Sequence, residues 1–117
     1  SIDNGLSYVN STSFSEDTGK MLENMAFLNL RKNFKEIFYF KGGNECDFLV
    51  KEGTKIKHAL QVCYEVNEDN KNREMNGLLE ALEKFNLRQG LILTFDQNDE
   101  FEVKGRKIIV KPIWKWL

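Results

Sequence analysis

Three side chains with oxygen atoms that can bind a metal ion stand among apolar neighbours in this sequence. Glu23 belongs to a helix-like segment, whereas Asp47 and Gln61 belong to two strand-like segments that follow it. A buried carboxylate is costly unless it is paired, hydrogen-bonded or bound to a cation, so its presence needs a physical reason. Asp is also among the poorest strand formers, which makes Asp47 a second anomaly. These residues are therefore the first candidates for a chemical site.

The helical position of Glu23 follows from the spacing of its apolar neighbours. On a helix with about 100° per residue, an arc of about 140° contains Leu22, Ala26, Leu30 and further large apolar residues. Glu23 falls inside this arc, so we expect its carboxylate on the buried face. The alternative is that Glu23 lies near the helix start, where it caps backbone amides or pairs with a lysine.

The two strand-like segments place their polar residues by alternation, because successive side chains point to opposite faces of a sheet. Alternation puts Asp47 on the face opposite to Cys46 and Phe48 in one strand. It puts Gln61 and Cys63 together on one face of the next strand. The alternative is that Gln61 and Cys63 are ordinary half-buried strand residues.

A helix packed across these strands brings the polar residues into one crevice. We then expect Glu23, Asp47 and Gln61 as metal ligands, and a catalytic set that adds Cys63 beside them. Three oxygen ligands suit Mg²⁺, which needs only one or two carboxylates and keeps several waters. Bound Mg²⁺ polarises a phosphate and lowers the pKa of a bound water.

The elements that must position these residues are indicated by periodicity and turn residues. Residues 1–16 are rich in Ser, Asn, Thr and Gly, which predicts an extended lead-in, and residues 17–117 have the length of one domain. The expected elements are a helix capped by Ser15 or Asp17, strands 36–41, 45–52 and 57–66, a helix over 72–86, a buried strand after Gly90, and a hairpin turning at 104–106. A long helix between two strands implies a parallel pair, so the fold class is α/β, an αβββαβ core with a mixed sheet and an added C-terminal hairpin.

Composition narrows the class of protein. Apolar residues make up 41% of the 117 residues and charged residues 30%, which is typical of a soluble globular domain. With a net charge of −1, contact with nucleic acid has to rely on a local patch. The sequence shows neither a signal peptide nor a run that could span a membrane. Cys46 and Cys63 favour free thiols in a reducing cytoplasm, with a disulfide between adjacent strands as the alternative.

A set of short motifs then resembles a known superfamily. This is the PD-(D/E)XK, or restriction-endonuclease-like, fold, which has the core order αβββαβ. Its pattern is an acid in the first helix, Asp on the second strand and (D/E)-x-K on the third. By position, Glu23 is similar to the helix acid and Asp47 to the strand Asp, while Gln61-Val62-Cys63 stands at (D/E)-x-K.

More narrowly, nearly the entire chain resembles a C-terminal domain of uncharacterised function found on prokaryotic AAA+ ATPases. The motifs that carry this resemblance, in order, are DNGL (3–6), GKMLENMAF (19–27), ECDF (45–48), QVCY (61–64), NRE (72–74) and PIWKWL (112–117). No GxxxxGK[ST] motif occurs in the sequence. The resemblance therefore implies that the chain is a fragment of a longer protein whose ATPase module lies elsewhere.

The two replacements on the third strand set the expected mechanism. Gln61 can ligate a metal through its carbonyl oxygen but brings no charge, so affinity for Mg²⁺ should fall. A lysine, with an ordinary pKa of about 10.4, is a cation that stabilises developing phosphate charge, whereas the thiol of Cys63, with an ordinary value of about 8.5, is neutral or anionic. Lys51 and Arg73 are candidates for the missing cation. The alternative for both is solvated surface charge.

The resemblance implies a nuclease-like domain with a degenerate metal site that binds nucleic acid or a partner in place of cutting. Lys51, Lys55 and Arg73 are the expected nucleic-acid contacts. Whether the domain is an enzyme stays open, because a Mg²⁺-dependent DNA endonuclease using Glu23 and Asp47 is one alternative. A purely structural or oligomerisation domain, which needs no polar crevice, is the other.

Overall fold

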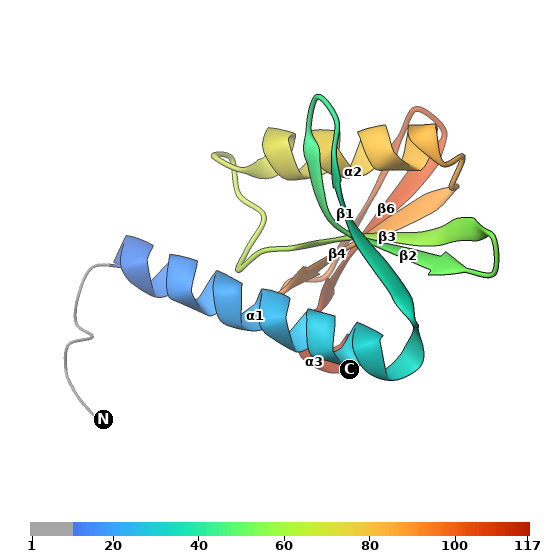
Figure 1. Ribbon diagram of the computed structural model, residues 1–117. Helices are drawn as coiled ribbons and strands as arrows, with labels where there is room; N and C mark the ends of the chain where they lie inside the picture. Colours follow the sequence, from blue (N-terminus) through green and yellow to red (C-terminus); the bar gives the residue numbers. More distant parts are fainter. Residues whose placement is uncertain (1–10) are drawn as a thin grey trace.

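The chain forms a mixed β-sheet with helices on both faces (Figure 1). The computed structural model describes residues 11–117, and side-chain surroundings from Asp17 onward. The elements are α1 (Ser11–Asn33), β1 (Glu36–Lys41), β2 (Glu45–Glu52), β3 (Lys55–Val62), α2 (Lys71–Lys84), β4 (Gln89–Thr94), β5 (Asp99–Val103), β6 (Arg106–Pro112) and α3 (Ile113–Trp116). The predicted α/β class is therefore confirmed, with three helices and a six-stranded mixed sheet.

The strand order across the sheet is β1-β2-β3-β4-β6-β5. β1, β2 and β3 pair antiparallel, β3 and β4 pair parallel as the connecting helix predicted, and β6 pairs parallel with β4. The predicted C-terminal hairpin is present, but its second strand joins the sheet and its first strand becomes the edge. This order follows from composition, because β6 contributes the buried Ile108 and Val110, whereas β5 carries Asp99, Glu100 and Glu102, and charged side chains suit an edge.

Two hydrophobic clusters lie on opposite faces of the sheet. α2 covers one face, and α1 with the short α3 covers the other (Figure 1). The buried residues of the α2 cluster are Cys46, Leu49, Ala59, Met75, Leu78, Leu79, Ala81, Leu82, Ile92, Ile108 and Val110. Those of the α1 cluster are Leu22, Ala26, Leu30, Phe48, Val50, Leu60, Val62, Leu93 and Ile113. No helix within residues 11–117 is both long and apolar enough to cross a lipid bilayer.

The first helix begins earlier than its N-cap signals predicted. Residues 11–16, which we expected to be extended, belong to α1, and residues 1–10 of the expected lead-in lie outside the described residues. Ser and Thr are only moderately poor helix formers, and adding residues to an existing helix costs far less than starting one. The strand that we expected to run to Val66 ends at Val62.

A β-bulge interrupts β2 beside Asp47. Phe38 of β1 pairs with Leu49, whereas Phe40 pairs with Cys46, so β2 takes three steps where β1 takes two. Cys46 consequently packs in the same cluster as Leu49, on the α2 face, while Phe48 packs on the α1 face. The strict alternation predicted for this strand is therefore wrong across the bulge.

The β1–β2 turn is tied to α2 by one carboxylate. Glu80 accepts hydrogen bonds from the backbone N–H of Gly43 (2.9 Å) and Asn44 (2.8 Å) and from the Asn44 side chain (3.1 Å). These bonds lower the pKa of the Glu80 carboxyl. They hold the hairpin turn over α2 and so fix one wall of the site described below.

Gly77 lets α2 approach β2 at backbone distance. A Cβ at this position would collide with the carbonyl oxygen of Glu45 and would lie 2.7 Å from Nε2 of Gln61. Backbone atoms cannot move aside as a flexible side chain can. The helix therefore needs a glycine here even though glycine costs about 1 kcal/mol within a helix.

We predict that Gly77→Ala lowers the free energy of unfolding by about 1–3 kcal/mol, because overpacking outweighs the gain in helix propensity. Asn76→Ala, at the exposed neighbouring position of α2, is the matched control and should be neutral or stabilising. Urea denaturation of both variants measures the effect. A stabilised Gly77→Ala variant would contradict the close approach.

Candidate functional site

The side chains of Asp47 and Gln61 continue the hydrogen bonding between β2 and β3 beyond the last backbone pair. The backbone pairing of β2 with β3 stops at Phe48 and Leu60. Beyond that point the N–H of Asp47 donates to Oε1 of Gln61 (2.8 Å), and Oδ2 of Asp47 accepts from the N–H of Val62 (2.8 Å). The two side chains thus take the places of missing backbone partners, which is the physical reason for an acid and an amide at these positions.

The side chain of Gln61 is fully engaged in holding three elements together. Its Nε2 group donates to the backbone oxygens of Glu45 on β2 (2.9 Å) and Glu74 on α2 (3.1 Å). Only 2% of the residue is exposed. Both N–H groups and the oxygen already have hydrogen-bond partners, so the amide has a structural role in joining β2, β3 and α2. A metal-ligand role for Gln61 stays a prediction.

An acidic hollow opens beside this junction. Its volume is about 270 Å³, and its lining residues are Gly43, Asn44, Glu45, Asp47, Gln61, Arg73 and Glu74. Glu74 is 9% exposed and forms an ion pair with Arg73 (3.2 Å). Glu74 was not among the residues predicted for the site. Its signal was the helical spacing of four residues to Leu78, which places an acid on the buried stripe of α2.

Burial perturbs both carboxyl groups of the hollow. Burial, together with the neighbouring carboxylates of Glu74, Glu23 and Glu45, raises the pKa of Asp47 to about 7, against the lowering effect of the Val62 N–H. Burial likewise raises the pKa of Glu74, which the hydrogen bond and charge of Arg73 partly offset. Such shifted groups in one hollow are typical of functional sites, although structural pairs also produce them.

Glu23 does not lie on the buried face that the helical wheel predicted. The buried stripe of α1 is narrow, running through Thr18, Leu22, Ala26 and Leu30 at intervals of four residues, and Glu23 falls outside it and is exposed. Its charge still raises the pKa values of Asp47 and Glu74. Glu23 therefore faces the same region as Asp47 but does not line the hollow.

Tyr39, a neighbour of Glu45, was also not among the predicted residues. A hydrogen bond with the Glu45 carboxylate, together with the acids around it, raises the pKa of the exposed Tyr39 to about 12. The phenol is therefore neutral at physiological pH and donates a hydrogen bond to Glu45. Its position in an aromatic strand gave no signal that distinguished it from its neighbours.

The two cysteines are free thiols, as predicted. Burial raises the pKa of Cys63 to about 12, and the acids Glu74 and Asp47 act in the same direction. Cys46 shows the same shift and contacts the carbonyl oxygen of Leu60 (3.4 Å). Both thiols are neutral at physiological pH, so Cys63 supplies neither a cation nor a thiolate nucleophile.

Of the three predicted cations, the structure brings only Arg73 to the hollow. Lys51 lies toward the other end of β2, where its ammonium pairs with Glu36 (3.8 Å). Lys55 is exposed at the start of β3. Among the side chains of residues 17–117, no group of three or more Asp, Glu, His or Cys is arranged to hold a metal ion.

Comparison with known proteins gives one relative. The chain is 40% identical over 117 aligned residues to "Uncharacterized protein MJ1544" of Methanocaldococcus jannaschii, and the alignment covers 91% of this chain. The chain spans about a quarter of that relative, with 26% of its length covered. No family model matches the sequence, and no solved structure matches it.

We predict that the free energy of unfolding falls as the pH rises from about 4 to about 7. The folded chain holds the Asp47 proton more tightly than the unfolded chain does, so this stabilisation is complete below the ordinary pKa of about 4 and is lost as the pH rises through about 7. The slope is at most about 1.4 kcal/mol per pH unit for one group. Asp47→Asn should flatten it, and Glu74→Gln should remove a further part.

Urea denaturation between pH 4 and 8 tests this dependence. The matched control is Asp69→Asn, at an exposed position outside the hollow, and it should keep the parental slope. An unchanged slope in Asp47→Asn would mean that the Asp47 carboxyl is solvated rather than buried.

We also predict that Gln61→Glu destabilises the fold by about 3 kcal/mol at pH 8, because a carboxylate cannot donate to the backbone oxygens of Glu45 and Glu74. Part of the loss should be recovered at pH 5, where the new carboxyl can hold a proton. Gln89→Glu, at an exposed position, is the control. Equal stability of the two variants at pH 8 would show that the amide bonds do not hold the junction.

Proposed function

We propose that this chain is a restriction-endonuclease-like domain whose metal site is degenerate, so that it binds a partner in place of cutting phosphodiesters. The element order α1-β1-β2-β3-α2-β4 and the mixed sheet support the fold assignment. The meeting of Asp47 and Gln61 at the β2–β3 junction supports their correspondence to the two strand positions of the superfamily pattern.

The observation that carries this proposal is that the amide oxygen and both amide N–H groups of Gln61 are already hydrogen-bonded within the fold. A carboxylate at this position of the third strand would be a metal ligand. The amide of Gln61 instead donates both of its N–H groups to backbone oxygens of β2 and α2. The neutral thiol of Cys63 then stands where a cation would stabilise phosphate charge. Two of the elements that cleavage requires are therefore replaced by groups with structural roles.

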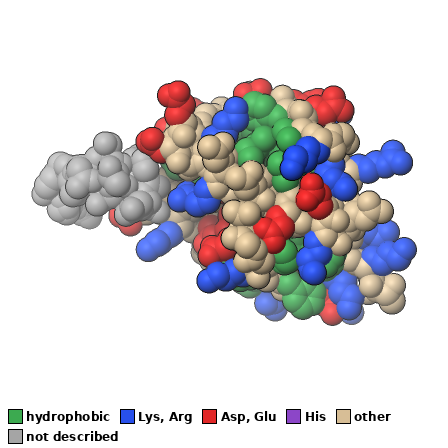
Figure 2. All heavy atoms as spheres, turned by 90° about the horizontal axis from the view of Figure 1, so that it is seen from above, with side chains coloured by type: hydrophobic (Ala, Val, Ile, Leu, Met, Phe, Trp, Pro, Cys, Tyr) green, Lys and Arg blue, Asp and Glu red, His purple; other side chains and the backbone are tan. Residues whose placement is uncertain are grey.

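Charge distribution favours a protein partner over a nucleic acid at this site. The hollow carries Glu45, Asp47 and Glu74 against the single cation of Arg73. Seen from the α2 side, acidic and basic side chains of the described part of the chain are interspersed, and they form no continuous basic surface in this view (Figure 2). A polyanion gains little from such a surface. The length of the relative fits a domain that works within a longer chain, such as one with an ATPase module.

A Mg²⁺-dependent nuclease is the second candidate, and one observation favours it. Asp47 and Glu74 face one hollow, and burial raises the pKa of both carboxyl groups even though Arg73 pairs with Glu74. Glu74 would then take the ligand role of Gln61, with Glu23 at the rim, and Arg73 would take the role of the lysine. The donor set fits only in part, because these acids do not form a group of three around one point. Bound Mg²⁺ would supply polarisation of a phosphate.

We expect no cleavage of plasmid, single-stranded DNA or RNA in Mg²⁺ or Mn²⁺, and calorimetry should show metal binding no tighter than millimolar, because the three acids of the hollow are not arranged around one point. The variants Asp47→Asn and Glu74→Gln, with Asp69→Asn as control, complete the experiment. Cleavage that the first two variants abolish and the control retains would overturn the binding proposal. It would establish the nuclease with Asp47 and Glu74 as its ligands.

A further inference from the structure

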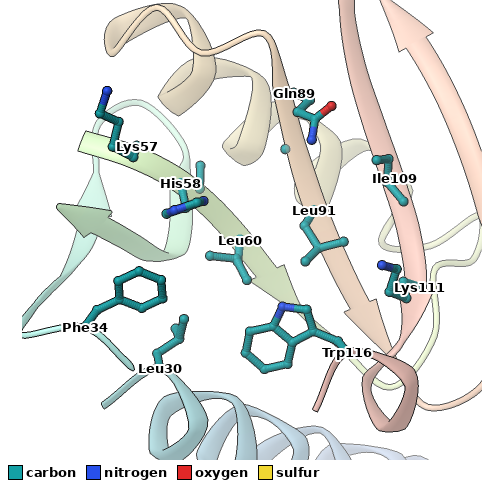
Figure 3. Close-up of a pocket in the computed structure, with 12 residues that line it drawn as sticks. Leu30, Phe34, Lys57, His58, Leu60, Gln89, Leu91, Ile109, Lys111 and Trp116 are labelled. Carbon is teal, nitrogen blue, oxygen red and sulfur yellow. The ribbon is translucent and has the colours of Figure 1, made fainter. Parts of the chain in front are cut away.

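A second hollow lies on the opposite face of the sheet from the acidic one. This groove has a volume of about 410 Å³. Its floor is formed by Leu60, Leu91 and Ile109, which lie side by side on β3, β4 and β6 in the sheet register (Figure 3). Two aromatic rings form its sides, Phe34 just after α1 and Trp116 on α3. The groove therefore has an apolar base with aromatic walls.

Incomplete helical cover creates this groove. α1 lies against β3, and α3 lies against β4 and β6 at their C-terminal ends. Leu91, Ile109, Phe34 and Trp116 are each only partly buried, in contrast to the fully covered residues beneath α2. Apolar side chains that converge on one hollow and stay partly exposed mark an interaction site more often than scattered ones do.

Polar groups at the rim are hydrogen-bond donors without a partner in the described chain. Figure 3 shows the ammonium group of Lys111 directed toward Leu91 and the indole nitrogen of Trp116 directed toward the floor. Within residues 17–117, neither group forms a hydrogen bond or ion pair. The groove lining contains Lys57, His58 and Lys111 and no carboxylate. Of these three, His58 alone has an ion-pair partner among residues 17–117, namely Glu52 (2.7 Å). This charge pattern complements an anion.

We propose that the groove binds a segment of a partner protein in which an Asp or Glu stands beside one or two large apolar side chains. The apolar chains fill the floor between Phe34 and Trp116, and the carboxylate accepts from Lys111 and the Trp116 indole. The groove is open to solvent, since its lining residues Leu91, Ile109 and Trp116 stay partly exposed, whereas a pocket normally encloses most of the surface of a free small molecule. A segment of a protein needs to insert only its side chains, which such a groove allows. The proposal is independent of the acidic hollow and of any nuclease ancestry.

Selection from a display library of short random peptides on the 117-residue chain tests this proposal. We expect the enriched peptides to carry an acid next to large apolar residues. Titration of one synthetic enriched peptide, followed by ¹H–¹⁵N NMR, should shift the indole N–H signal of Trp116. Trp114 is 63% exposed on the same short helix and does not line the groove, so its indole signal is an internal control and should stay unchanged.

Two charge-reversal variants sharpen the test. Lys111→Glu should weaken binding of the enriched peptide at least tenfold, whereas Lys104→Glu, in the exposed β5–β6 turn, should leave it unchanged. Enriched peptides without carboxylates, or equal binding to both variants, would overturn the proposal. So would binding of free phenylacetate as tight as that of the peptide, which would identify a small-molecule pocket, or self-association that Lys111→Glu abolishes, which would identify a second copy as the occupant.

Discussion

The end of the β2–β3 backbone ladder at Phe48 and Leu60, beside the β1–β2 bulge, is the constraint on which the site depends. A bulge in a strand leaves backbone groups without partners, and buried groups of this kind must be satisfied. Asp47 and Gln61 provide the missing acceptor and donors, and Gln61 also reaches the backbone of α2. The helix can come close enough only because residue 77 is a glycine. The bulge, the two polar side chains and the glycine therefore form one structural unit.

This unit explains why the carboxylate of Asp47 is held close to other negative charges. The carboxylate is kept in a half-buried position by its bond to Val62, while the acids of α1, β2 and α2 face it. Removing it would relieve repulsion but would leave an N–H without a partner, unless the replacement is also an acceptor of similar shape. A site of this kind can lose its original chemistry and still keep its residues, because the fold itself uses them.

Much of this architecture was predictable from sequence, and the failures have physical causes. Period-two and period-3.6 patterns gave β1, β2, α2 and β4 nearly at their observed bounds. The inward position of Glu23 was wrong, because a helical wheel reports which residues are apolar but not how wide a stripe the neighbouring strand covers. The face of Cys46 was wrong, because the sequence carries no local sign of the bulge. Glu74 was missed, since its environment depends on how closely α2 lies to β2, which residue types alone do not reveal.

The position of β6 has a consequence for how the chain is made. The strands that pair with β6 on either side, β4 and β5, both precede it in sequence. The part of the sheet formed by these three strands therefore lacks its middle strand until residue 112 has been synthesised. A chain still emerging from the ribosome can form the β1–β2–β3 meander, whose contacts are local. Until β6 is made, however, one edge of β4 has no partner strand. During synthesis the nascent domain thus exposes an unpaired strand edge that is prone to aggregation. A pause in translation shortly before β6 would prolong this exposure and give chaperones more time to bind the chain.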